Sequence, residues 1–216
     1  MWWVFPVMAL IGYLLGSVPT GLIMGRLARG IDIRDYGSGK TGFTNALRTV
    51  GLRASLPILV IDVAKGALAI VIARLLSDNA YVQVVGGLAA VAGHDWPIFA
   101  GFRGGRGVGA SFGVVLGMNP LVGLALIPVA IAIAWVTRYM SVMSISGAVV
   151  AAGVFTGLAA ADVLPTAYAV YAIIAGALAI VLHRENIKRL LAGTEPKIGR
   201  GGERRAASLA SSPPPN

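Results

Sequence analysis

The sequence predicts an all-α integral membrane protein of about seven transmembrane helices, with the N-terminus outside and the C-terminus in the cytoplasm. Hydrophobic residues make up 56% of the 216-residue chain and charged residues 12%, whereas average soluble domains carry about 25% charged residues. The apolar residues form continuous runs, which favour helices over the alternating strands of a membrane barrel. The basic residues gather on one predicted side of the membrane.

Seven apolar runs account for the predicted helices in chain order. They cover residues 4–25, 56–76, 81–92, 108–118, 120–136, 144–161 and 164–182. A run of about 20 residues crosses the ~30 Å hydrocarbon core, so the fourth run is short for a full crossing. Residues 1–199 are predicted to form a single polytopic domain. The polar, proline-rich residues 200–216 predict a disordered cytoplasmic tail.

The distribution of lysine and arginine sets the orientation. Of the 18 such residues, all except Lys65 and Arg74 fall at residues 26–55, after the third and fifth runs, or after residue 182. With seven crossings and an outside N-terminus, all these regions face the cytoplasm. The net charge of +9 therefore reflects this bias and attraction to anionic lipid headgroups, and it does not indicate nucleic-acid binding.

The stretch GSGKTGFTN at residues 37–45 looks like the end of a nucleotide-binding phosphate loop, G-x-x-x-x-G-K-[ST]. The position that should hold the first glycine is Arg34, and a charged segment rather than a buried strand precedes the loop. The sequence therefore predicts no nucleotide here. Backbone N–H groups of a glycine-rich loop can nevertheless surround an anion. Cysteine is absent, which excludes disulfides and thiolate sites.

Three segments are too polar and too glycine-rich to be plain connections, namely residues 32–51, 93–113 and 183–199. The predicted topology places all three on the cytoplasmic side. In the second segment, glycines flank Arg106, whose forked side chain is suited to phosphate. A glycine-rich turn with an arginine that only sets the topology is the alternative.

The two histidines both lie in these segments. His183 ends the seventh run, where a histidine can simply interact with the helix dipole. His94 precedes Asp95 and can equally hold its loop in place. Two histidines in distant segments, without a recurring carboxylate pattern, predict no metal site. Asp62 and Lys65, three residues apart in the second run, form either a functional intramembrane pair or a pair that only neutralises itself.

Four motifs follow one another along the chain: GSVPTG, GSGxxGxTNxxRxxG, GHxxPxFxxFxGGxGV and HRxNIxRLxxGxExKIG. Together they resemble the acyl-phosphate:glycerol-3-phosphate acyltransferases of bacteria, the PlsY family, over essentially residues 12–199. Several spaced motifs in a fixed order are far more specific than one glycine loop.

The resemblance implies a multi-pass enzyme of the bacterial inner membrane, with its active site facing the cytoplasm. Such an enzyme transfers a fatty acyl group from acyl-phosphate to the 1-hydroxyl of glycerol 3-phosphate, giving lysophosphatidic acid and phosphate at the start of phospholipid synthesis. Its partners are glycerol 3-phosphate, acyl-phosphate and membrane lipids. Acyl-CoA, nucleotides, cofactors and metal ions are not required.

The resemblance also implies site residues. It gives catalytic roles to Ser38, Arg48, His183 and Asn186. It gives substrate-binding roles to Thr44, Asn45, Gly104, Gly105, Arg106 and Gly107. His94 and Glu195 are expected to be structural residues near the site.

Two departures from the family pattern stand in these motifs. Lys40 and Thr41 occupy positions where the family commonly has Asn followed by Pro or Ile, and Arg106 replaces a common Lys. The exchange at Arg106 keeps the charge. The exchange at Lys40 and Thr41 either alters substrate preference or marks a divergent paralogue.

The role of His183 and the class of protein both have alternatives. His183 is either a general base for the hydroxyl proton or a phosphate ligand, with the departing phosphate taking the proton. A membrane transporter or lipid-binding protein for phosphorylated metabolites is the non-catalytic alternative, although matching inverted halves are not evident. A soluble-type acyl-CoA acyltransferase needs an H-x-x-x-x-D box, and position 99 is Phe rather than Asp.

Overall fold

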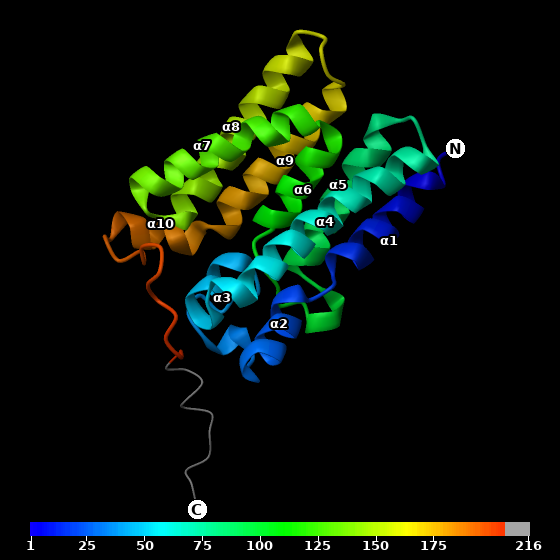
Figure 1. The fold of residues 1–216 in the computed structure, drawn as a ribbon. Coiled ribbons are helices and arrows are strands. Elements are labelled where there is room, and N and C mark those ends of the chain that lie inside the picture. The colour runs from blue at the N-terminus through cyan, green and yellow to red at the C-terminus, as the bar shows by residue number, and fades with distance from the viewer. Residues whose placement is uncertain (206–216) are drawn as a thin grey trace, which may run out of the picture.

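A computed structural model describes residues 1–205 and is built from helices joined by short turns and three longer polar loops (Figure 1). The helices are α1 (Val4–Gly16), α2 (Thr20–Arg29), η1 (Ile33–Asp35), α3 (Phe43–Val50), α4 (Leu52–Leu76), α5 (Ala80–Asp95), η2 (Ile98–Ala100), α6 (Val108–Met118), α7 (Pro120–Thr137), α8 (Met140–Ala160), α9 (Thr166–Leu182) and α10 (Arg184–Leu191). All seven predicted apolar runs are helical.

The first run differs from the prediction because it is broken into α1 and α2. The break falls at Ser17, Val18 and Pro19, just before α2 begins. Proline lacks the N–H that a continuous helix would use, and its ring clashes with the preceding turn. The helix is therefore interrupted at this point, although residues 4–29 together still make one candidate span.

Fewer than seven helices are long and apolar enough to count as candidate membrane spans. Four candidate spans are found among the described residues: 4–29, α4, α7 and α8. Helices α9 and α10, bent by 56° at their junction, make a fifth if they are taken together. Helix α6 is apolar but has only 11 residues. Seven crossings thus remain a prediction.

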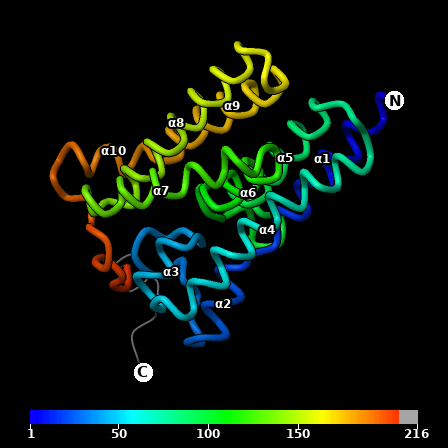
Figure 2. Tube along the Cα trace, turned by 45° about the horizontal axis from the view of Figure 1, so that its top comes forward, coloured from blue at the N-terminus to red at the C-terminus, as the bar shows by residue number. Residues whose placement is uncertain are grey.

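Helices α1, α4 and α5 form one group, and α7, α8 and α9 form another, with α6 packed between them (Figures 1 and 2). Glycines allow the closest approaches. A side-chain carbon at Gly66 of α4 would collide with the backbone carbonyl of Ala110 in α6, and one at Gly113 would collide with that of Val63. Such small-residue contacts bring membrane helices together and hold α6, with the loop before it, firmly against α4.

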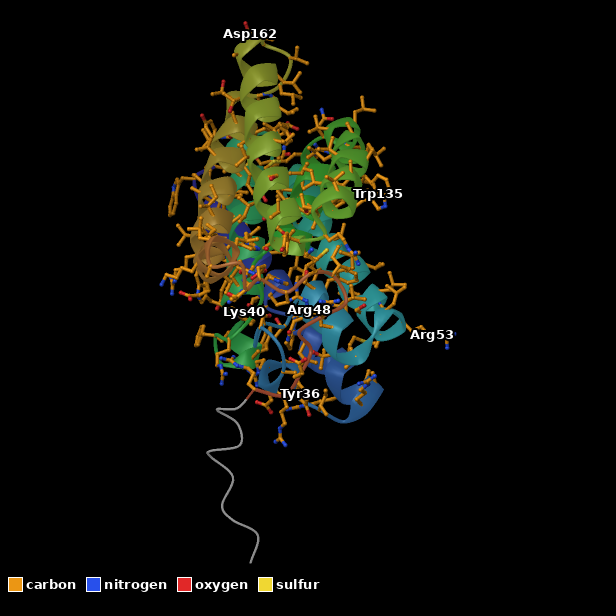
Figure 3. All side chains as sticks on the ribbon, turned by 90° about the vertical axis from the view of Figure 1, so that its left-hand side faces the viewer. Tyr36, Lys40, Arg48, Arg53, Trp135 and Asp162 are labelled. Carbon is orange, nitrogen blue, oxygen red and sulfur yellow. The ribbon has the colours of Figure 1, made fainter. Side chains whose placement is uncertain are left out.

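The loops that carry the motifs lie at one end of the helix bundle. Figure 3 shows Lys40, Arg48 and Tyr36 toward that end and Asp162 at the other. The start of the predicted tail is attached to the first loop, since the Gly37 N–H donates to the Glu203 carbonyl at 2.9 Å and the Arg205 N–H to that of Asp35 at 2.8 Å. Residues 206–216 of the tail lie outside the described residues.

Candidate active site

A cavity of about 370 Å³ lies where the three polar segments meet. Its polar end is lined by Ser38, Lys40, Thr44, Asn45, His94, Arg106 and His183. Its apolar part continues between α6, α7, α8 and α9, along side chains such as Leu126, Ile131 and Met143. The cavity can therefore hold an anionic group at one end and a hydrocarbon chain at the other.

Asn45 holds the first loop in shape. Its side chain is buried, and its Oδ1 accepts the N–H of Ser38 at 2.9 Å. Its Nδ2 donates to the carbonyls of Ile33 at 2.9 Å and Lys40 at 2.8 Å. Because the amide is occupied by the loop itself, Asn45 positions Ser38 and Lys40 at the cavity. The hydroxyl-bearing residues Ser38 and Thr44 line the same wall.

The glycine loop folds around His94. The Gly104 N–H donates to the Asp95 carbonyl at 3.2 Å, and the Gly105 N–H donates to the His94 carbonyl at 3.1 Å. A side-chain carbon at Gly105 would collide with the His94 imidazole, and Gly107 has a φ of +67°, which favours glycine. Since two of the N–H groups are used within the loop, these glycines shape the turn that carries Arg106 into the cavity.

Arg106 reaches the cavity with part of its guanidinium unpaired. Its Nε is buried and has no hydrogen-bond partner in the described chain. Burial lowers the pKa of Arg106 to about 10, and the charge of Arg189 acts in the same direction. The side chain is still cationic at neutral pH, so an anion can bind there with a charge-assisted hydrogen bond.

Arg48 does not line the cavity, unlike the other predicted residues of the first loop. Its Nη2 donates to the Pro196 carbonyl at 3.1 Å, while its Nε is buried without a partner among residues 1–205. Burial lowers the pKa of Arg48, and the nearby Glu195 opposes that change. Arg48 thus joins the first segment to the third.

His183 lies at the junction of α9 and α10, buried in the cavity wall. Its Nδ1 is 2.8 Å from the Ala179 carbonyl oxygen, which can only accept, so the neutral ring carries its proton on Nδ1 and keeps a lone pair on Nε2. Burial lowers the pKa of His183 to about 4, against the effect of the Ala179 hydrogen bond. At neutral pH the ring is therefore an uncharged hydrogen-bond acceptor.

Asn186 and Glu195 form a network beside the cavity, not within its lining. The Asn186 Nδ2 donates to Glu195 Oε1 at 2.7 Å, and the Ser141 hydroxyl donates to the same oxygen at 2.8 Å. The Arg189 Nε donates to Oε2 at 2.8 Å. Burial opposes these interactions, yet they hold the pKa of Glu195 below its ordinary value. Asn186 was expected to face the substrate with His183, but only its Oδ1 is without a partner in the described chain.

A buried polar cluster borders the cavity, and the sequence did not predict that its members lie together. The Asp62 Oδ1 lies 2.9 Å from the Lys65 Nζ and 3.5 Å from the His94 Nδ1. The Thr20 hydroxyl donates to the same oxygen at 3.3 Å. The Asp62–Lys65 ion pair was predicted from the sequence. The contact of Asp62 with His94, which joins α4 to α5, was not predicted, because the two residues are far apart in the sequence. No group of three potential metal ligands occurs in residues 1–205.

The comparisons with known proteins agree with the motifs. The family profile described as glycerol-3-phosphate acyltransferase matches residues 6–193. A glycerol-3-phosphate acyltransferase of Parasynechococcus marenigrum (strain WH8102) is 45% identical over 192 residues, which cover 88% of this chain and 87% of the relative. Another, from Thermoanaerobacter sp. (strain X514), is 42% identical over 195 residues, covering 90% of this chain and 96% of the relative.

Two solved structures share the fold. The glycerol 3-phosphate form of PlsY, an integral membrane glycerol 3-phosphate acyltransferase, has a TM-score of 0.81 and 34% identity, covering 96% of this chain and 99% of that one. Its lysophosphatidic acid form has a TM-score of 0.80 and 36% identity, covering 89% and 94%. The fold of the present chain is thus similar to that of an acyltransferase of the membrane.

Proposed function

The chain belongs to the glycerol-3-phosphate acyltransferase family, and on that premise we propose that it takes its acyl group from acyl-phosphate. The acceptor is the 1-hydroxyl of glycerol 3-phosphate, and the products are lysophosphatidic acid and phosphate. The observation that carries the proposal is the cavity, whose cationic end and long apolar part suit a phosphate and a fatty acyl chain. The related structures are described as glycerol 3-phosphate and lysophosphatidic acid forms.

The reaction exchanges one bond at the acyl carbonyl carbon. The hydroxyl oxygen of glycerol 3-phosphate forms a bond to this carbon, and the bond to the bridging phosphate oxygen breaks, with the electron pair leaving on phosphate. Acyl-phosphate is already activated, so the protein need not supply a covalent nucleophile. Holding both reactants in one site and stabilising charge provide much of the rate. We assign phosphate binding to Arg106, with the hydroxyls of Ser38 and Thr44 along the same wall.

The proton of the attacking hydroxyl decides the role of His183. With a pKa of about 4, its imidazole is a weak base, while its Nε2 can accept a hydrogen bond. A departing phosphate is the stronger proton acceptor at neutral pH. We infer that His183 orients the 1-hydroxyl through Nε2 and that the proton ends on phosphate. Asn45, Asn186, Glu195 and Arg48 then act by holding the three segments together.

The acyl donor can be tested directly with purified protein in detergent. Acyl-phosphate and labelled glycerol 3-phosphate should yield labelled lysophosphatidic acid, because the mixed anhydride supplies its own leaving group. Acyl-CoA should yield none, and the His183→Ala variant serves as the control for uncatalysed transfer. Product formed from acyl-CoA but not from acyl-phosphate would show that the proposed donor is wrong.

We further propose seven crossings of the bacterial inner membrane by one domain, residues 1–199, with an outside N-terminus and a cytoplasmic site. Because the chain has no cysteine, Ser38→Cys and Asp162→Cys each create a single labelling position. Impermeant maleimide should reach Asp162→Cys from the periplasmic side of intact spheroplasts and Ser38→Cys only in inverted vesicles. Labelling of both from one side would contradict the topology.

A further inference from the structure

Lys40 is a cation in the cavity that the proposed reaction has not yet used. Its side chain lines the polar end and is half-buried. No ion pair or side-chain hydrogen bond of Lys40 occurs within residues 1–205. Its ammonium group therefore has all three donors available for an anion that enters the cavity.

The backbone at Lys40 is fixed from both sides. The peptide unit between Lys40 and Thr41 accepts a hydrogen bond at its carbonyl from Asn45 Nδ2, at 2.8 Å. The N–H of the same unit donates to the Gly104 carbonyl at 3.4 Å. The first loop and the glycine loop are therefore joined at this peptide. The Lys40 side chain starts from an anchored point on the cavity wall, and it is not a residue of a free loop.

Lys40 and Arg106 are also near one another. Burial lowers the pKa of Lys40, and the charge of Arg106 lowers it further. Among the described residues that line the cavity, Asp62 is the one carboxylate, and it is already paired with Lys65 at 2.9 Å. His183 is neutral at physiological pH. Asp95 does not line the cavity, but its buried carboxylate acts on both Lys40 and Arg106. The polar end thus holds two neighbouring cations, and the one acidic group near both of them lies behind the cavity wall.

We propose that Lys40 binds a substrate phosphoryl group, beside a second phosphoryl group held by Arg106. The proposal rests on the proposed function, since the reaction brings two phosphorylated molecules, acyl-phosphate and glycerol 3-phosphate, into one cavity. Each phosphoryl group then meets one cation, and the repulsion between Lys40 and Arg106 is relieved when both are bound. The ammonium group of lysine binds phosphate as a compact point charge with three donors.

The test removes the charge of Lys40 while keeping its stem. In Lys40→Met, calorimetry should show weaker binding of inorganic phosphate or glycerol 3-phosphate, by about 10- to 100-fold, the range for a lost hydrogen bond to a charged group. Lys40→Arg should stay within a few-fold of wild type. Arg53→Met removes an equal charge from an exposed position that points away from the bundle (Figure 3), and its binding should be unchanged.

Kinetics then distinguish the two sources of the phosphoryl group. A raised KM for glycerol 3-phosphate alone assigns Lys40 to the acceptor, and Arg106 then holds the donor instead. A raised KM for acyl-phosphate, with weaker inhibition by phosphate, assigns it to the donor. Lys40→Met with wild-type affinity for both phosphate and glycerol 3-phosphate would overturn the proposal. Because the binding measurement needs no turnover, a failure of acyl-phosphate as donor counts against the proposed function and leaves this test of Lys40 intact.

Discussion

Replacing Arg106 by alanine should raise the KM for glycerol 3-phosphate by about 10- to 100-fold, the effect of losing a hydrogen bond to a charged group. The guanidinium lines the cavity, and its buried Nε has no partner in the described part of the chain. A bound phosphate would supply that partner. Steady-state kinetics with purified protein, at saturating acyl donor, measure the change.

Two further variants make the result for Arg106 specific. Arg106→Lys keeps the charge and should change the KM only a few-fold. Arg103→Ala removes an exposed cation from the same loop and should leave the KM unchanged. Thermal unfolding in detergent should show that all three variants remain folded. An unchanged KM in Arg106→Ala would mean that this arginine only sets the topology.

The apolar helices could be predicted because their side chains face lipid or one another over long continuous stretches. The break between α1 and α2 could not be placed with the same certainty. Membrane helices often tolerate proline when neighbours satisfy the freed backbone groups, so Pro19 alone does not decide whether the chain bends or ends a helix. Helices α3 and α10 were missed as well, because both lie in charged segments that were read as loops.

Only those site residues that belong to the sequence motifs could be predicted. The motifs pointed to His183 and Arg106, and the structure brings both to one cavity. Contacts between distant positions could not be read from spacing. The Arg48 side chain donates a hydrogen bond to the Pro196 carbonyl, and the Asp62 carboxylate lies beside the His94 imidazole. Helix packing and loop closure bring these positions together. Such contacts depend on the whole fold rather than on local sequence.

Lys40 shows a different limit of sequence reasoning. In the sequence, Lys40 belongs to a stretch that only partly matches a nucleotide-binding phosphate loop, and it departs from the family pattern. Neither observation could say whether the side chain faces solvent, lipid or the site. The structure places the Lys40 side chain in the cavity lining. Its backbone is held there by hydrogen bonds from Asn45 and to the glycine loop, which lies far along the chain.

His183→Ala should lower kcat by about 10²-fold, the order of magnitude expected when a reacting group is no longer held in position. The thermal unfolding temperature in detergent should change little, because the Ala179 carbonyl loses a single hydrogen-bond donor. Asn186→Ala is the comparison. It takes a hydrogen bond from the buried Glu195, so it should lower the unfolding temperature along with kcat. A His183→Ala variant with near-normal kcat would make His183 a purely structural residue.

The acid range tests whether the His183 ring is neutral, as both mechanisms require. Since the pKa is lowered to about 4, the ring stays neutral as the pH falls from 8 to 6, and the ratio of wild-type to His183→Ala turnover should stay constant. A ring with an ordinary pKa of about 6.5 would become protonated over this range and lose its acceptor, so the ratio would fall. His183→Gln adds a second criterion. Its amide oxygen can accept the hydroxyl hydrogen bond but cannot take the proton, so partial turnover supports transfer to phosphate, whereas complete loss would favour a general base.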